Sequence, residues 1–160
     1  MKFETAVMHI LEFEGAYVFD SNDPGGETNF GISKRAYPNL DIKNLTREKA
    51  IEIYYQDYWQ PLRLYLIPAK LRLSLFDCAV NQGVNQAIKF LQSAVGVVQD
   101  GVLGPITIEA ANTFPVYNAL QKIILARLNH YQKIPGWVRY SGGWTRRLLI
   151  VIFASLAADN

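Results

Sequence analysis

The sequence contains one cysteine and two histidines, and this scarcity excludes several kinds of site. Cys78 has no partner for an internal disulfide, and its place in an apolar run predicts a buried, reduced thiol. His9 and His130 lie far apart, and no Cys/His cluster has the spacing of zinc ligands. The G-x-S-x-G motif of serine hydrolases and the glycine-rich phosphate loop are also missing. Metal peptidases, cysteine amidases and serine hydrolases therefore lack their required residues, and we expect neither a metal nor an organic cofactor.

Long apolar runs are missing as well. Residues 148–158 read LLIVIFASLAA, which is short of the roughly 20 residues that a membrane-spanning helix needs. This run predicts a buried core helix. The first 15 residues, MKFETAVMHILEFEG, place acids inside an apolar run and lack a small-residue cleavage site, so they do not resemble a signal peptide.

Charged residues are few and unevenly placed. They make up 19% of the 160 residues, and the net charge is +2. Residues 115–160, which we call the basic C-terminal tail, hold six Lys/Arg and only Asp159 as an acid. Such a tail is consistent with a weak contact with an anionic surface, and the solvated face of a helix explains it as well. Because its one block of consecutive like charges is Arg146-Arg147, the tail does not predict nucleic-acid binding.

The pattern of apolar residues predicts a mostly helical α+β fold. Apolar residues at helical spacing indicate an amphipathic helix over residues 3–14, with Glu14 at its end. Cap and turn residues place the other predicted helices at residues 46–58, 68–83, 84–95, from 105, 116–133 and 143–157. Residues 16–32 alternate short apolar pieces with turn residues, which indicates a small β lobe near residues 15–35. We expect a helical lobe from about residue 46 onward and a cleft between the two lobes.

One segment has the composition of a glycosidase site. Residues 12–33 read EFEGAYVFDSNDPGGETNFGIS, and Glu14, Asp23 and Thr28 face one another if this loop folds back. Hydrolysis of a glycosidic bond needs one carboxylic acid to protonate the leaving oxygen and a second carboxylate to activate water or stabilise positive charge. Glu14 is the predicted acid, because apolar neighbours favour the neutral form of a carboxyl group. Asp23 lies in a polar turn and should stay ionised, and the Thr28 hydroxyl is placed to hold the attacking water.

The same residues have a simpler interpretation. Glu14 can be a solvated acid at a helix end, and Asp23 can merely begin a turn, because Asp, Asn, Pro and Gly are ordinary turn residues. Asp20 is also a rival of Asp23 for the second carboxylate, since only two residues separate them.

Four stretches of the chain resemble a known family. EGAYVFDSNDPGGETNFGIS, AIEIYYQDYWQPLR, LFDCAVNQG and DGVLGPIT are similar, in this order, to glycoside hydrolase family 108, the muramidases of phage endolysins and related bacterial secretion-associated proteins. The resemblance implies a lysozyme-like fold that cuts the β-1,4 bond between N-acetylmuramic acid and N-acetylglucosamine. It places the family's acid, in a Glu-Gly-x-Tyr motif, on Glu14. A similarity to phage-type lysozymes, which share a Glu, Asp, Thr order, places the other roles on Asp23 and Thr28. Ala16 stands where family members often have a second glycine, a mild change that should not remove the acid.

The resemblance also implies how the chain is organised and where it acts. Residues 1–92 correspond to the muramidase region, and residues 93–160 resemble a predicted peptidoglycan-binding domain that should share the core. The expected partner is the peptidoglycan glycan strand, and we expect a monomer. The implied setting is a phage lysis enzyme made in the host cytoplasm, which reaches the wall after holin-like release. A lytic transglycosylase and a non-catalytic wall-binding protein are the alternatives.

Two further groups of side chains are candidates for substrate binding. The aromatic residues that end one predicted helix are Tyr54, Tyr55, Tyr58 and Trp59. Aromatic side chains at a helix end either stack on a sugar ring of the substrate or fill the core, and we expect a core role for two of these four residues. From this group we take Tyr54 and Trp59 as substrate-binding candidates. Asn81 and Gln82 close another predicted helix, where their amides bind acetamido groups of the substrate or cap the helix end.

Overall fold

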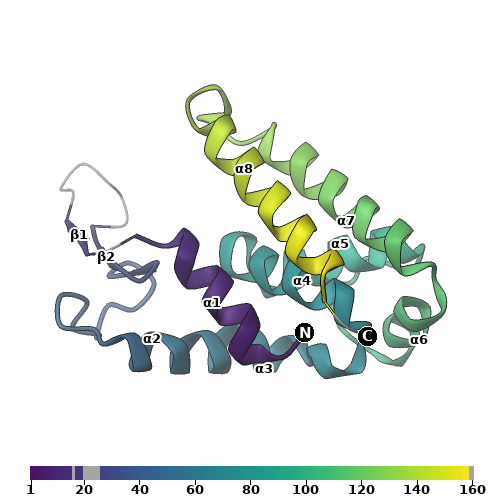
Figure 1. The fold of residues 1–160 in the computed structure, drawn as a ribbon, viewed down its shortest axis with the longest axis horizontal. Coiled ribbons are helices and arrows are strands. Elements are labelled where there is room, and N and C mark those ends of the chain that lie inside the picture. The colour runs from purple at the N-terminus through teal and green to yellow at the C-terminus, as the bar shows by residue number, and fades with distance from the viewer. Residues whose placement is uncertain (16, 20–25, 159–160) are drawn as a thin grey trace.

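The computed structural model describes residues 1–15, 17–19 and 26–158. A small β-sheet lies to one side of a mostly helical body, and helix α1 runs from the sheet into that body (Figure 1). The helices are α1 (Phe3–Phe13), α2 (Arg47–Tyr54), α3 (Gln60–Leu62), α4 (Ala69–Gln82), α5 (Val84–Val95), α6 (Pro105–Thr113), α7 (Val116–Tyr131) and α8 (Trp137–Leu156). The predicted α+β class with a small β lobe and a helical lobe is therefore confirmed.

The β lobe is a three-stranded antiparallel sheet in the order β1-β2-β3. Its strands are β1 (Val18–Phe19), β2 (Glu27–Asn29) and β3 (Ile32–Ser33). Strands β2 and β3 are joined by Phe30 and Gly31, whose φ angles of 50° and 77° suit the two-residue turns that match strand twist. The buried Asn29 donates hydrogen bonds to the carbonyl groups of Ile42 and Leu45, at 3.1 and 3.4 Å. These bonds fix the turn relative to the loop that follows the sheet.

The predicted helix over residues 46–58 is α-helical only as far as Tyr54. Thr46 caps it as expected, because its hydroxyl accepts a hydrogen bond from the Lys49 N–H at 3.2 Å. The chain then widens into a π-helical segment, η1 (Tyr55–Trp59), in which the Gln60 N–H donates to the Tyr55 carbonyl five residues earlier. A short 3₁₀ helix, η2 (Leu64–Leu66), follows α3.

Helix α4 lies at the centre of the helical body. It packs against α1, α5, α7 and α8, and residues on all its sides are buried, as expected for an interior helix. One cluster of buried hydrophobic residues runs from Ala6 to Val151. The predicted buried thiol is confirmed, since Cys78 is free and buried, and burial raises its pKa to about 12. The division of the chain at residue 92 stays a prediction.

Helix α8 begins at Trp137, and the predicted start at residue 143 is wrong. Gly142 and Gly143 lie inside the helix at a cost of about 1 kcal/mol each. Aromatic packing offsets this cost, because Trp144 stacks on Tyr131 of α7 with ring centres 5.0 Å apart. Residues 137–142, which lie ahead of the predicted start, therefore belong to the helix as well.

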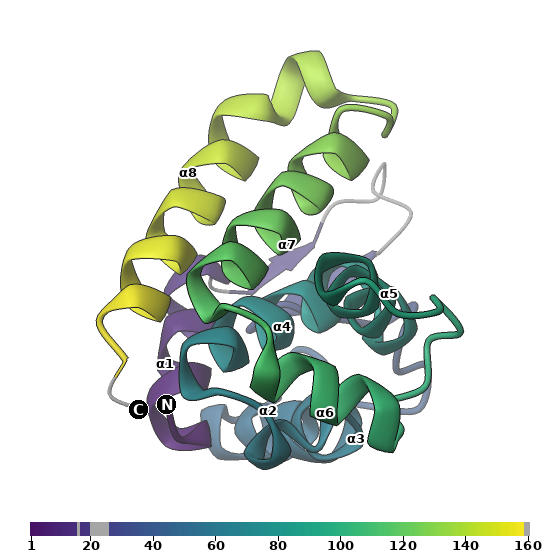
Figure 2. The same cartoon turned by 90° about the vertical axis from the view of Figure 1, so that its right-hand side faces the viewer.

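The prediction that the C-terminal apolar run packs in the core is confirmed for one face of α8, whereas Leu149 and Phe153 on the other face are exposed. Helices α7 and α8 run side by side in both views, and α8 also packs against α4 (Figure 2). It buries Leu148, Val151 and Ser155. Among the described residues, none of the helices is long and apolar enough to cross a membrane.

Candidate active site

Glu14 lies directly after α1, where the chain leaves the helix for the β lobe. Its backbone N–H donates to the Ile10 carbonyl at 3.2 Å, and its φ and ψ of −90° and 127° turn the chain out of the helix. About 21% of its side chain is exposed. The carboxylate is therefore fixed at its base and reachable from outside, as a group that transfers a proton to a substrate must be.

The turn between β2 and β3 lies against the Glu14 side chain. A Cβ atom at Gly31 would stand 2.6 Å from Glu14 Cγ and Oε2 and 2.6 Å from the Tyr54 hydroxyl oxygen. That hydroxyl donates a hydrogen bond to the Phe30 carbonyl at 2.7 Å. Burial raises the pKa of Tyr54, and the Glu14 carboxylate raises it further, so the phenol stays neutral. The β lobe and α2 thus meet at Glu14.

Arg147 of α8 contacts Glu14 from the helical side. Its Nη1 donates to Glu14 Oε1 at 2.8 Å, and its Nε donates to Asp77 Oδ1 at 2.7 Å. The guanidinium carbon also lies 4.6 Å from the centre of the Phe13 ring. Burial acts to lower the pKa of Arg147, but the carboxylates of Asp77 and Glu14 outweigh it and raise that pKa. Arg147 therefore stays charged and links α1, α4 and α8. This ion pair was not expected for Glu14, whose neighbours were predicted to be largely apolar.

A second buried pair continues this chain of charges. Asp77 Oδ2 accepts a hydrogen bond from Arg127 Nη2 of α7 at 2.5 Å, and both side chains are fully buried. Arg127 also donates to the Ser74 carbonyl, the Tyr131 hydroxyl and Gln82 Oε1, each at 3.3 Å. Glu14, Arg147, Asp77 and Arg127 thus form a continuous row of alternating charge, which we call the ion-pair chain.

The ion-pair chain changes the interpretation of the basic C-terminal tail. Arg127 is fully buried and Arg147 is only 12% exposed, so neither presents a free surface charge. The exposed basic residues of the tail are Lys122, Lys133, Arg139 and Arg146. A weak contact with an anionic surface stays a prediction, now limited to these four residues.

Of the three predicted catalytic residues, Glu14 and Thr28 lie within the described part of the chain. Asp23 and its rival Asp20 lie outside the described residues. Thr28 is half-buried in the middle of β2, paired with Val18 and Ser33 on the neighbouring strands. It belongs to the same hairpin whose turn contacts Glu14. The catalytic roles of Glu14, Asp23 and Thr28 stay predictions.

The two aromatic candidates for substrate binding lie in or against the core. The Tyr54 side chain is 1% exposed and takes part in the site through its hydroxyl. Trp59 is partly buried and packs against Phe3 and Phe76, with ring centres 5.4 and 5.1 Å apart. These are the surroundings of core residues, although we took these two as the substrate-binding candidates and expected a core role for two of the four aromatic residues.

The two amide candidates differ from each other. Asn81 is exposed, and its Nδ2 donates to the Asp77 carbonyl at 2.7 Å. Gln82 is half-buried, and its Oε1 accepts from the Cys78 thiol at 3.0 Å and from Arg127. Gln82 therefore belongs to the surroundings of the ion-pair chain. Binding of substrate by Tyr54, Trp59, Asn81 and Gln82 stays a prediction.

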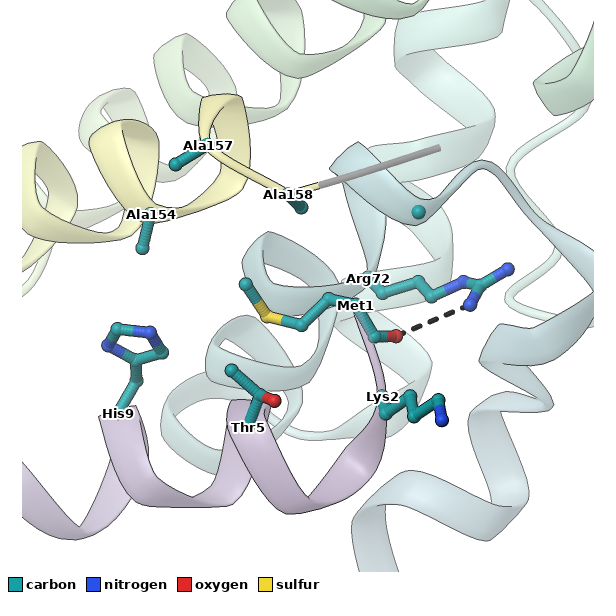
Figure 3. A pocket seen from close by; sticks show the side chains of 9 residues that line it. Met1, Lys2, Thr5, His9, Arg72, Ala154, Ala157 and Ala158 are labelled. Carbon is teal, nitrogen blue, oxygen red and sulfur yellow. Dashed lines mark hydrogen bonds between the residues drawn. The ribbon is translucent and has the colours of Figure 1, made fainter.

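Two cavities lie at opposite ends of α1. One, of about 370 Å³, adjoins Arg147 and is lined by Glu12, Phe13, Gly143, Arg146, Arg147 and Ile150. The other, of about 620 Å³, lies between the first turns of α1 and the end of α8 (Figure 3). Lys2, His9 and Arg72 surround it, and none of the predicted site residues that the structure describes lines it. The larger cavity is therefore not the candidate active site.

No group of three or more His, Cys, Asp or Glu residues within the described ranges is placed to hold a metal ion.

Sequence reasoning missed Arg147 and Asp77 as members of this site. Arg147 stands 133 residues after Glu14, and no short motif links residues so far apart. A signal was present, however, because Asp77 interrupts the apolar run LSLFDCAV and Arg127 interrupts IILARL. A charged residue on a buried helix face needs a partner of opposite charge.

The chain is similar to one known family and to a solved structure. The family model for "Glycosyl hydrolase 108" matches residues 7–83. A solved structure titled "Structure of Brucella abortus SagA" is 33% identical to this chain, with a TM-score of 0.89. The match covers 98% of this chain and 94% of that one. No curated protein matches the sequence.

The family match and the similarity to this structure identify the protein as a glycoside hydrolase with a lysozyme-like α+β fold. The chain belongs to glycosyl hydrolase family 108, whose members degrade peptidoglycan.

Proposed function

We propose that this protein is a muramidase, which hydrolyses the β-1,4 bond between N-acetylmuramic acid and N-acetylglucosamine with Glu14 as general acid. The observation that carries the proposal is the placement of the Glu14 carboxylate. It is partly exposed at the junction of the two lobes, against the Gly31 turn and in contact with Arg147. Family membership supports peptidoglycan as the substrate.

The proposed reaction needs a proton donor and a water molecule. The Glu14 carboxylic acid gives its proton to the glycosidic oxygen while the bond from that oxygen to the sugar C1 breaks. Positive charge that develops on the sugar is stabilised by the Asp23 carboxylate. Water held by Thr28 adds to C1, and the proton that this water loses restores the acid. The products are two shorter glycan strands, one of which has a reducing muramic end.

Analysis of the products by mass spectrometry tests this proposal. Purified murein is digested with the protein, and the released fragments are measured before and after borohydride reduction. We expect reducing N-acetylmuramic ends, which gain the mass of two hydrogen atoms on reduction. Anhydro-muramic ends would assign a lytic transglycosylase instead, and reducing glucosamine ends would assign the other glycosidic bond. Intact glycan would indicate a protein that binds the wall without cutting it.

We also propose an endolysin role, in which the enzyme is made in the host cytoplasm and reaches the wall after holin-like release. The resemblance of the motifs to phage enzymes supports it. Expression inside a bacterial host tests the role. We expect lysis only when a holin is expressed together with the protein, and lysis without a holin would contradict the proposed route.

A further inference from the structure

Arg147 contacts Glu14 while it is held at two other points. Its Nε donates to Asp77 Oδ1 at 2.7 Å, and its guanidinium group lies over the ring of Phe13, the residue directly before Glu14. Only 12% of the Arg147 side chain is exposed, so few other positions are open to it. The guanidinium group thus holds Glu14 Oε1 at 2.8 Å from a nearly fixed point.

Asp77, which anchors Arg147, is itself firmly placed. It is fully buried on α4, and Arg127 from α7 binds its second oxygen. Moving either side chain would leave an unpaired charge in the protein interior, which is strongly unfavourable. Asp77 is therefore held in place by two ion pairs, and it fixes the position of Arg147 beside Glu14.

Few charged or titratable groups face Glu14 in the described part of the chain. Helix α8 supplies the Arg147 cation and α2 supplies the neutral Tyr54 hydroxyl. Asp77 of α4 and Arg127 of α7 lie behind Arg147. Arg147 and the turn at Gly31 thus enclose the Glu14 carboxyl group from two sides.

We propose that Arg147, anchored on Asp77, is a positioning residue that holds the Glu14 carboxyl group in one orientation for catalysis. This inference rests on the proposed function of Glu14 as general acid. Arg147 and Arg127 both lie beyond residues 7–83, the segment that the family model matches. The last two helices therefore complete the active site that begins at the end of α1.

Three variants of α8 test this proposal, each assayed for kcat and KM on soluble peptidoglycan fragments. For Arg147→Gln we expect kcat to fall roughly 10- to 100-fold with little change in KM, because a misplacement of about 1 Å can cost about 100-fold. Circular dichroism should show a native fold, so that the loss lies in catalysis. Arg147→Lys keeps the cation but has a single nitrogen for two carboxylates. It should recover part of the lost kcat at an unchanged KM.

Arg146→Gln is the matched control, because it removes the same charge from the exposed neighbouring residue. It should keep the kcat and the KM of the wild type. An Arg147→Gln enzyme with unchanged kcat would overturn the proposal, and so would an equal loss of kcat in Arg146→Gln. Arg147→Lys preserves the charge beside Asp77, so a folded variant is available if the glutamine variant unfolds. A wild-type enzyme that releases no reducing muramic ends would instead refute the muramidase function and not the role of Arg147.

Discussion

Gly31 is the residue whose replacement most directly disturbs the surroundings of Glu14. It combines a φ of 77° with a close approach of its backbone to Glu14 and Tyr54. A side chain at this position faces two separate problems. The backbone conformation disfavours any Cβ atom, and the space for that atom is already filled.

Replacement of Gly31 by alanine should therefore impair both stability and activity. We expect a lower melting temperature and at least a tenfold loss of murein hydrolysis, because the turn must move away from Glu14. Gly96→Ala separates the two causes. Gly96 has nearly the same φ, 79°, but it lies at the end of α5, where no atom of the described residues comes within 4 Å of the place that a Cβ atom would take. It should lose stability and keep its activity once folded. An active, folded Gly31→Ala enzyme would show that the turn does not position Glu14.

Asp23 and Asp20 are the two candidates for the second catalytic carboxylate, and their asparagine variants distinguish between them. If Asp23 stabilises charge or orients water, Asp23→Asn should lower activity far more than Asp20→Asn does at equal stability. Lysis rates measured alongside thermal melts make this comparison. A larger loss at Asp20 would move the catalytic carboxylate three residues toward Glu14 along the chain.

At the scale of elements, α8 serves both the core and the site. Its buried side includes Leu148 and Val151, and Arg147 reaches from it to Glu14. The sequence predicted the core role from the apolar run, which needs only local information. It did not predict the contact with Glu14, because that contact depends on how α8 packs across α4.

Two adjacent leucines test the core role of α8. Leu148 is 3% exposed and Leu149 is 50% exposed. Leu148→Ala should lower the free energy of unfolding by about 2–5 kcal/mol, since it leaves a cavity in the core. Leu149→Ala makes the same chemical change at the surface and should alter it by at most about 0.5 kcal/mol. Urea unfolding followed by circular dichroism measures both values. Equal effects would mean that α8 is not docked as described.

At the scale of the whole molecule, local signals predicted the elements well. The Thr46 cap, the Gly83 and Gly96 helix ends and the start of α6 at Pro105 all follow from short-range chemistry. The start of α8 was missed, because residues 137–142 are helical in a segment where Trp144 of α8 stacks on Tyr131 of α7. Packing between helices supports this first part of α8, and the local sequence pattern does not show it.

The candidate site was only partly predictable for the same reason. Glu14 could be selected from its position at a helix end and from the motif around it. The ion-pair chain joins residues from four helices or their ends, separated by up to 133 positions. Asp77 and Arg127 indicate in the sequence that buried charges need partners, but not which partners they take. Only the folded chain identifies Arg147 as the residue that connects them to Glu14.

The central claim is that Glu14 supplies the proton, and Glu14→Gln tests it most directly. Glutamine keeps the size and polarity of the side chain but has no proton to give. Lysis of permeabilised cells, followed as a loss of turbidity, should fall by about 10²- to 10⁴-fold while circular dichroism shows a native fold. Glu12→Gln is the control, because Glu12 lies two residues earlier and 69% of its side chain is exposed. It should lyse cells at the rate of the wild type. A folded Glu14→Gln protein that lyses cells as fast as the wild type would contradict the assignment.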